Sequence, residues 1–252
     1  MINFNLEEKV VLVTGGSRGL GLEIARNLLA QKAKVVICAR KQEGLDYAGT
    51  ELGGGDNLLL VTAHIAREEE VDNLFDKVVE RFGRLDVLIN NVGMNIMTGS
   101  VTDIDYSLWN KIIDSNLNGT YLCSVRAAKI MKKQKEGKII SISSIAGTRA
   151  AAGMGVYGIA KAAIEMLTKV LAAELAGDGI RVNAVAPCMV KTDFSRPFWS
   201  DPALLAEIEK TIPLSRIAEP ADIVKVVLFL SSPASDFITG QTITVDGGAT
   251  AI

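Results

Sequence analysis

A strand, a glycine-rich turn and a helix at the start of the chain constrain the fold most strongly. Residues 9–14 are a short β-branched run, a G-x-x-x-G-x-G stretch ends at Gly21, and residues 22–30 are amphipathic. Such glycines let the backbone bend tightly and let a pyrophosphate approach bare N–H groups at a helix N-terminus, where the dipole favours negative charge. The spacing differs from the usual G-x-G-x-x-G. The pattern favours a nucleotide-binding unit over a plain glycine-rich loop.

The same alternation continues along the first half of the chain. Residues 34–39, 57–62 and 85–90 are predicted strands, and residues 68–82 are a predicted helix. Repeated strand–helix units imply a parallel sheet with both faces covered. With 252 residues, 48% of them hydrophobic, the chain is long enough for a large core, and we expect one α/β domain.

Composition argues against several classes of function. With 27 basic and 29 acidic residues the formal charge is −2, so no net field attracts nucleic acid or an acidic membrane. The three cysteines are far apart and His64 is the single histidine, so we expect no metal site. No basic-plus-apolar leader and no apolar span of about 18 residues is present, and the last residues are no peroxisomal signal. We therefore expect a cytoplasmic protein.

Two arginines bear on the choice of coenzyme. The predicted strand at 34–39 ends at Arg40, where an acidic residue would bind the ribose hydroxyls of NAD. Arg18 lies inside the glycine turn, so two guanidinium groups can converge on one phosphate. This favours NADP(H) over NAD, although either arginine alone is compatible with an ordinary exposed charge. Asn91 and Gly93 follow the strand at 85–90, at the sheet edge where such folds bind ligands, or form a simple strand-ending turn.

Tyr157, Lys161 and Ser144 form a candidate proton-transfer group. If residues 157–177 are helical, Tyr157 and Lys161 lie one turn apart on one face. A cation beside a phenol favours the phenolate, so we expect Lys161 to lower the pKa of Tyr157 from near 10 toward neutrality. Ser144 supplies a hydroxyl for a carbonyl oxygen. The alternative is an ordinary surface Tyr and Lys, because Y-x-x-x-K alone is a weak signal.

Several motifs in this order resemble the short-chain dehydrogenase/reductase family. They are Thr14-Gly-x-x-x-Gly-x-Gly21, Asn90-Asn-x-Gly93, Asn116, Ser144, Tyr157-x-x-x-Lys161 and Asn183-Ala-Val-Ala-Pro187. The resemblance covers essentially the whole chain. It implies one domain over residues 1–252, a Rossmann-type doubly wound parallel sheet of about seven strands with helices on both faces. Residues 1–100 would mainly bind the dinucleotide, and residues 101–252 would carry catalysis, a substrate lid at about 192–213 and oligomer contacts.

The resemblance also assigns roles to single residues. Tyr157 would be the general acid for carbonyl reduction, Lys161 its partner and a ribose ligand, and Ser144 the residue that orients the substrate oxygen. Asn116 would kink its helix and link Lys161 to a proton relay. The implied cofactor contacts are Gly15, Ser17, Arg18, Gly19, Leu20, Gly21, Arg40, His64, Ile65, Asn91, Gly93, Tyr157, Lys161, Pro187, Val190 and Thr192.

Two positions depart from the family pattern. His64 and Ile65 stand where the family usually has an Asp that binds the adenine amino group, and Cys188 replaces the glycine that usually follows Pro187. His64 is expected to be structural or to lie beside the adenine edge. Cys188 is expected near the nicotinamide or the substrate, without a redox role, because no resolving cysteine is nearby.

The expected substrate is a bulky apolar ketone or aldehyde. The side chains expected to contact it are Ser144, Met154, Tyr157, Cys188, Phe194 and Trp199, and further methionines, Ile96 and Phe198 would surround the pocket. Lid packing alone is the alternative explanation for these apolar residues. Residues 194–199 and 238–242 are most similar to NADPH-dependent carbonyl and retinal reductases.

The resulting prediction is hydride transfer between NADPH and an apolar carbonyl compound. One alternative is a 3-oxoacyl-[acyl-carrier-protein] reductase, which needs a basic pocket mouth, for which Arg149, Lys191 and Arg196 are scattered candidates. The others are an NAD-dependent alcohol oxidiser and a non-catalytic dinucleotide-binding sensor, which would be free to lose Tyr157 or Lys161. The apolar helix at 157–176 and the resemblance together imply a homotetramer, built from this helix, its predecessor and the strand at 241–245.

Overall fold

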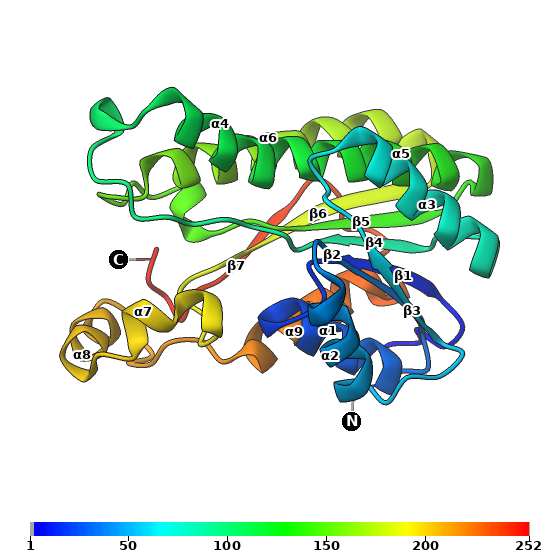
Figure 1. Ribbon diagram of the computed structural model, residues 1–252, viewed down its shortest axis with the longest axis horizontal. Helices are drawn as coiled ribbons and strands as arrows, with labels where there is room; N and C mark the ends of the chain where they lie inside the picture. The colour runs from blue at the N-terminus through cyan, green and yellow to red at the C-terminus, as the bar shows by residue number, and fades with distance from the viewer. Residues whose placement is uncertain (1–2, 252) are drawn as a thin grey trace.

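The computed structural model describes residues 3–251, whose strands form one seven-stranded sheet (Figure 1). All neighbouring strands are parallel, in the order β3-β2-β1-β4-β5-β6-β7. Their bounds are β1 Val10–Thr14, β2 Lys34–Ala39, β3 Leu58–Thr62, β4 Val87–Asn90, β5 Gly137–Ile142, β6 Ile180–Pro187 and β7 Thr242–Val245. This confirms the predicted Rossmann-type sheet. The strand order reverses between β1 and β4, which is where such sheets bind ligands.

Side chains of the central strands alternate between two cores. In β1, Val11 and Val13 pack on one face of the sheet, while Val10 and Leu12 pack on the other. All five residues of β1 are buried, because the strand has a neighbour on each side and helices above and below. Strands buried on both faces are continuous apolar runs, which is how they appear in the sequence.

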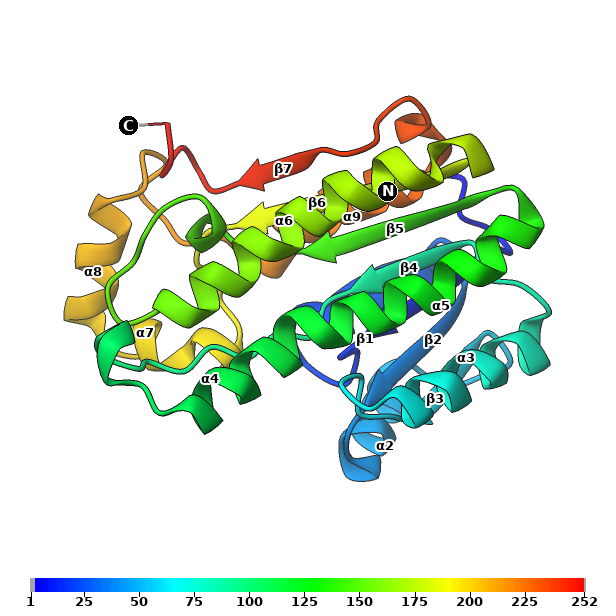
Figure 2. The ribbon, with the colours of Figure 1, turned by 90° about the horizontal axis from the view of Figure 1, so that it is seen from above.

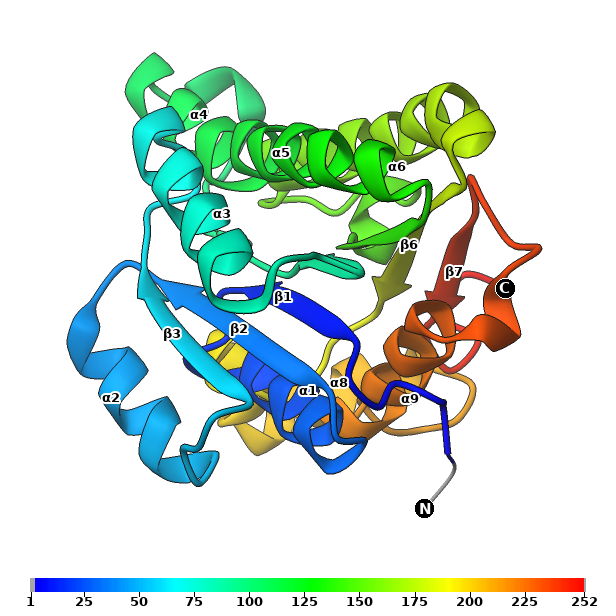
Figure 3. The ribbon, with the colours of Figure 1, turned by 90° about the vertical axis from the view of Figure 1, so that its right-hand side faces the viewer.

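Helices cover both faces of the sheet, as Figure 3 shows. The helices on one face are α1 (Gly19–Ala30), α2 (Gln42–Glu51) and α9 (Pro220–Ser231). Those on the other face are α3 (Glu68–Phe82), α5 (Gly119–Gln134) and α6 (Gly155–Leu175). Each helix contributes its apolar stripe to the core on its side.

Shorter helices surround the carboxyl edge of the sheet, where the strand arrows point in Figure 2. They are α4 (Tyr106–Ile113), α7 (Arg196–Trp199) and α8 (Pro202–Lys210). Single turns occur at η1 (Val101–Asp103), η2 (Asp114–Asn118), η3 (Ile145–Gly147), η4 (Ala176–Asp178), η5 (Asp193–Ser195) and η6 (Pro233–Ser235). Within residues 3–251, no helix is both long enough and apolar enough to span a membrane.

Helix α1 begins earlier than the sequence pattern predicted. The amphipathic pattern begins at Leu22, whereas the helix begins at Gly19 inside the glycine turn. Gly15 and Gly19 have φ angles of 67° and 55°, and Arg18 between them is extended. The turn is therefore shorter than predicted, and the first N–H groups of α1 lie at the carboxyl edge of β1.

Candidate active site

A cavity of roughly 1350 Å³ lies at the carboxyl edge of the sheet. Its wall is formed by residues that follow the ends of β1, β2, β4, β5 and β6, together with the first turns of α6 and part of α8. All sixteen predicted cofactor residues, from Gly15 to Thr192, line this cavity. Among the other predicted site residues Ser144, Met154, Cys188 and Phe194 line it as well, whereas Asn116 and Trp199 do not.

The glycine turn is shaped to admit a ligand close to its backbone. A Cβ atom at Gly21 would lie 2.4 Å from the carbonyl oxygen of Gly15, so position 21 has no room for a side chain. Asn91 holds the turn, because its Nδ2 donates to the carbonyl oxygens of Thr14 at 3.0 Å and Gly15 at 3.2 Å. The Thr14 hydroxyl in turn accepts from the Asn91 backbone N–H at 3.0 Å. The first N–H groups of α1 and this turn fit the pyrophosphate of a dinucleotide.

Arg18 and Arg40 extend the cavity at the end of β2. Both are exposed and line the cavity, and neither has an ion pair or a side-chain hydrogen bond within the described residues. Arg26 and Arg81 elsewhere on the surface are each paired with an acidic residue. Two guanidinium groups without carboxylate partners are available to a phosphate.

Ser144, Tyr157 and Lys161 are brought together by β5 and α6. Ser144 follows the last residues of β5, and α6 presents Tyr157 and Lys161 one turn apart, as predicted. The Lys161 Nζ lies 5.4 Å from the centroid of the Tyr157 ring and donates to the carbonyl oxygen of Ile142 at 2.8 Å. Lys161 is 2% exposed, so its ammonium is enclosed by the protein and the cavity wall.

The predicted direction of the Tyr157 pKa shift is wrong for the protein alone. Burial raises the pKa of Tyr157 from 10.0 to about 12, and hydrogen bonding with the Ser144 hydroxyl opposes this rise. Burial lowers the pKa of Lys161 from 10.5 to about 8. The prediction considered the attraction between a cation and a phenolate but not the effect of burial on the two pKa values. Both groups are removed from water, which disfavours both charged forms, and the ammonium lies over the ring and bonds a backbone carbonyl.

A second hydrogen-bonded pair holds β5 and α6 together beside Ser144. The Ser143 hydroxyl contacts Glu165 Oε1 at 2.8 Å and the carbonyl oxygen of Lys161 at 3.3 Å. Together with the Lys161–Ile142 bond, this fixes the end of β5 against the helix that carries Tyr157. Ser143 and Glu165 were not predicted, because neither residue is part of the motif.

Asn116 lies within a helix distortion, as the resemblance implied. It occupies the π-helical turn η2 between α4 and α5 and is fully buried. Its Nδ2 donates to the carbonyl oxygens of Met94 at 2.9 Å and Ile112 at 2.8 Å, and its Oδ1 accepts from the Met94 N–H at 3.2 Å. A Cβ at Gly93 would lie 3.3 Å from Asn116 Oδ1 and 3.5 Å from Lys161 Nζ. Asn116 thus positions the backbone that passes next to Lys161.

The two residues that depart from the family pattern both line the cavity. His64 also stabilises its own turn, since its ring Nδ1 accepts from the Ala66 N–H at 3.2 Å and its backbone N–H donates to Glu70 Oε2 at 2.7 Å. Burial raises the pKa of the Cys188 thiol, whose Sγ lies 3.7 Å from the carbonyl oxygen of Met189. A protonated thiol is a poor nucleophile.

Trp199 faces the lid segment and not the cavity. Its indole Nε1 donates to the carbonyl oxygen of Thr192 at 3.0 Å and lies 3.1 Å from Ser195 Oγ. The side chains of Phe194 and Phe198 line the cavity in its place. Alternate residues of such a short helix face different ways, so the sequence could not show which aromatic ring lies inside. Other cavity residues that the sequence analysis missed are Asn95, Ile145, Ile208, Thr211, Ile212 and Ala249.

The described residues contain no group of three or more His, Cys, Asp or Glu placed to hold a metal ion. The candidate proton-transfer residues Ser144, Tyr157 and Lys161 and the glycine turn all line the cavity.

Comparison with known proteins identifies the family. The family profile described as enoyl-(acyl carrier protein) reductase matches residues 15–250. Dehydrogenase/reductase SDR family member 4 of Bos taurus is 37% identical over 97% of this chain and 88% of its own length. The 3-oxoacyl-[acyl-carrier-protein] reductase of Synechocystis sp. is 39% identical over 96% of this chain and 97% of its own. The crystal structure of a putative gluconate dehydrogenase from Agrobacterium tumefaciens has a TM-score of 0.94 at 31% identity, with complete coverage of both chains.

The chain belongs to the short-chain dehydrogenase/reductase family. It is therefore an oxidoreductase that binds a nicotinamide dinucleotide and acts on a small molecule. This confirms the family that the sequence motifs resembled.

Proposed function

We propose that the protein reduces an apolar ketone or aldehyde with NADPH. The observation that carries the proposal is a single cavity with Arg18 and Arg40 unpaired at one end and Ser144, Tyr157 and Lys161 at the other. The filled catalytic positions favour an enzyme over a sensor that only binds the dinucleotide. The absence of an acidic residue at the end of β2 disfavours the NAD-dependent alternative.

Three residues of the cavity, Ser144, Tyr157 and Lys161, have different proposed roles in carbonyl reduction. When bound, the nicotinamide supplies the hydride. The Ser144 hydroxyl donates to the substrate oxygen and orients it. Tyr157, with a pKa of about 12, holds its proton at neutral pH and delivers it to the oxygen as negative charge develops there. Lys161, with a pKa of about 8, carries its positive charge below that pH. Its ammonium stabilises the phenolate that Tyr157 becomes when it gives up its proton.

The apolar part of the cavity supports the proposed substrate class. The residues that line it are apolar, namely Met94, Ile96, Met154, Phe194 and Phe198. Two isoleucines add to this wall: Ile208 in α8 and Ile212 just after the end of α8. We propose that residues 192–213 act as the substrate lid, since η5, α7 and α8 carry much of this apolar wall. A bulky apolar carbonyl compound would bury its surface there.

A reductase of acyl-carrier-protein substrates is the second candidate, since one similar protein is named so. An acidic carrier protein needs a free basic surface around the cavity mouth. Here Lys191 pairs with Glu219 at 3.5 Å and Arg196 lies 3.9 Å from Asp193. Arg149 donates to the carbonyl oxygen of Ala249 at 2.9 Å. Two of the three cations thus have acidic neighbours and the third bonds the backbone, which weakens this basic surface, and we favour the free carbonyl compound.

We also propose a homotetramer. Side chains on the outer faces of α5 and α6 are apolar and exposed, namely Tyr121, Ile159, Met166 and Val170. Such a surface on two adjacent helices supports contact with another copy of the chain.

The proposal is tested by NADPH oxidation against a panel of ketones, aldehydes and acyl thioesters, repeated with NADH. We expect apolar ketones or aldehydes to give the highest kcat/KM, with NADPH preferred at least about tenfold. The double variant Arg18→Ala/Arg40→Ala should lower kcat/KM for NADPH by about 10–100-fold and leave that for NADH nearly unchanged, because charge-assisted phosphate contacts are lost. Arg81→Ala, far from the cavity, is the control. A preference for NADH, for thioesters or for small charged keto acids would overturn the proposal.

A further inference from the structure

The segment that carries Ser144 is held against α6 by a carboxylate that has no role in the reduction described above. The Ser143 hydroxyl donates to Glu165 Oε1 at 2.8 Å, and it lies 3.3 Å from the carbonyl oxygen of Lys161. Ser143 is 2% exposed, and its backbone N–H donates to the carbonyl oxygen of Val185 in β6 at 2.7 Å. Ser143 therefore joins the sheet, through its backbone, to α6, through its side chain.

The turn that follows Ser144 packs closely against the same part of α6. A Cβ at Gly147 would lie 2.7 Å from Glu165 Oε1, and a Cβ at Gly158 would lie 2.7 Å from the carbonyl oxygen of Ala146. Glycine at both positions lets the turn and the helix approach each other closely. The same carboxylate oxygen thus accepts from the residue before Ser144 and lies beside the turn after it.

The direction of the Ser144 hydroxyl depends on this segment. Ser144 has an extended backbone, its Oγ accepts from the Ala146 N–H at 3.2 Å, and its hydroxyl hydrogen-bonds with Tyr157. Successive side chains of an extended segment point to opposite sides. Holding the Ser143 side chain on α6 therefore also fixes the side to which the Ser144 hydroxyl points.

We propose that Glu165 is a positioning residue for the reduction, which holds Ser144 where its hydroxyl and the Tyr157 phenol reach one substrate oxygen together. Glu165 acts as a hydrogen-bond acceptor and not through its charge. Within the described residues it forms no ion pair with Lys161, whose ammonium donates to the carbonyl oxygen of Ile142. This inference rests on the proposed carbonyl reduction. A displacement of about 1 Å between reacting groups lowers the rate about 100-fold.

The test compares side chains that keep or lose the acceptor, with the carbonyl compound that the wild-type protein reduces fastest. Glu165→Ala should lower kcat about 10–100-fold, because Ser144 is no longer held in place. The KM for the substrate and the Kd for NADPH, followed by nicotinamide fluorescence, should change less than about threefold. Glu165→Gln keeps an acceptor oxygen and should retain at least about a third of kcat. Glu174→Ala, on an exposed glutamate of α6, is the matched control and should change none of these values.

A variant at the other end of the hydrogen bond separates positioning from a loss of folding. Ser143→Ala should lower kcat by a similar factor, and the double variant Ser143→Ala/Glu165→Ala should be no slower than the slower single variant, because both changes break one interaction. Thermal unfolding of each variant gives the folded fraction by which kcat is corrected. If Glu165→Ala does not fold, Ser143→Ala carries the test with the same expected loss.

The outcomes distinguish this assignment from the proposed function. An unchanged kcat in the folded single variants would overturn the Glu165 assignment alone. Equal losses in Glu165→Gln and Glu165→Ala would overturn it too, because they would show that the charge matters and not the acceptor. Losses that multiply in the double variant would also overturn it. If the wild-type protein reduces no ketone or aldehyde with NADPH, the proposed function fails and the assignment fails with it.

Discussion

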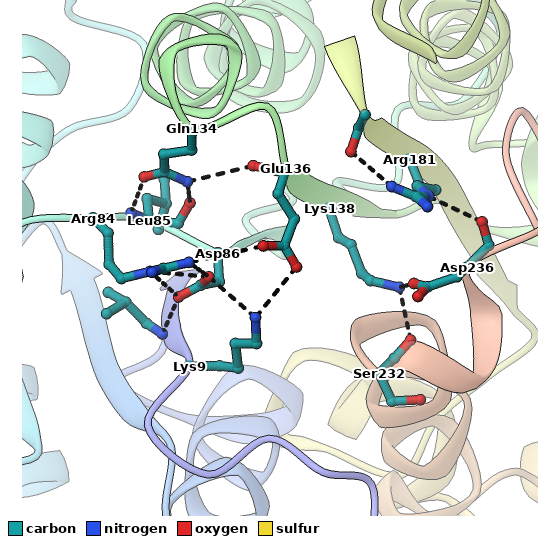
Figure 4. Close-up of polar contacts among 12 residues, drawn as sticks. Lys9, Arg84, Leu85, Asp86, Gln134, Glu136, Lys138, Arg181, Ser232 and Asp236 are labelled. Atoms are coloured by element: carbon teal, nitrogen blue, oxygen red, sulfur yellow. Dashed lines mark hydrogen bonds and ion pairs between the residues drawn. The ribbon is translucent and has the colours of Figure 1, made fainter. Parts of the chain in front are cut away.

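The two ends of the sheet differ in whether their charged side chains have partners within the protein. At the amino ends of the strands, charged side chains are paired within the protein, as Figure 4 shows. Asp86, which is 5% exposed, accepts from the Val10 N–H at 2.8 Å and from Arg84 at 2.6 Å, with Lys9 at 3.5 Å. At the carboxyl ends, Arg18 and Arg40 have no such partner within the described residues.

The pairing at the amino end extends across the neighbouring strands. Lys138 donates to Asp236 at 2.6 Å and to the carbonyl oxygen of Ser232 at 2.7 Å (Figure 4). Gln134 exchanges two hydrogen bonds with the backbone of Leu85. These contacts join β4, β5 and α9 and leave few groups free for a ligand. The comparison supports the proposal that the carboxyl end binds ligands and carries the chemistry, while the paired groups of the amino end stabilise the fold.

The largest effect that would test this division is expected at the carboxyl end. Tyr157→Phe should reduce turnover by about 10³-fold, because the proton donor is lost. Its free energy of unfolding should change by less than about 1 kcal/mol, since the ring and its packing remain. NADPH oxidation and urea unfolding measure the two effects. Tyr106→Phe, on an exposed tyrosine, is the control, and retention of more than about a tenth of the activity would contradict the assignment.

A smaller effect of the opposite kind is expected at the amino end. Asp86→Ala should lower the free energy of unfolding by about 3 kcal/mol, since the buried Val10 N–H loses its acceptor and Lys9 and Arg84 keep only the exposed Glu136 as an acidic partner. The folded variant should keep its kcat. Asp56→Ala, which removes a fully exposed partner of Arg81, should cost less than about 1 kcal/mol. Equal losses in the two variants, measured by urea unfolding, would show that the amino-end network is not stabilising.

The smallest effect concerns the pH dependence of Lys161. Its pKa is about 8 in the folded protein and 10.5 as the ordinary value, so between these pH values the unfolded chain binds more protons. Lys161 should therefore contribute a rise of about 1 kcal/mol to the free energy of unfolding between pH 8 and 9, against the opposing contribution of the buried cysteines, whose pKa values are raised. Lys161→Met should lack this rise, while Lys169→Met, an exposed lysine of α6, should keep it. Identical pH profiles for wild type and Lys161→Met would refute the shift.

The sequence predicted those parts of the molecule that local pattern determines. The bounds of β2 and α3 agree with the pattern, because each has a clear run of apolar residues or a clear helical period. The neighbouring positions of Tyr157 and Lys161 follow from helix geometry alone. The pKa of Tyr157 did not follow, because its burial depends on walls that other segments contribute.

Other features of the site depend on segments far apart in the chain. Asn95 contacts Met154, which no local pattern connects to it. The Trp199 indole bonds the carbonyl oxygen of Thr192, and Phe198 lines the cavity where Trp199 was expected. These orientations arise from packing between loops, so the motif could name the residues near the cavity but not the side chains that face it.

The strand order affects how the site is assembled as the protein folds. Val13 of β1 pairs with Ile37 of β2 and with Ile89 of β4, so the chain extends the sheet outward and then returns to its centre. The glycine turn and the opposite wall of the cavity, which β5 and α6 form, therefore lie far apart in the sequence. Contacts between distant segments form slowly because long loops must close first. A coenzyme that contacts both walls would link these distant segments, and its binding would raise the free energy of unfolding.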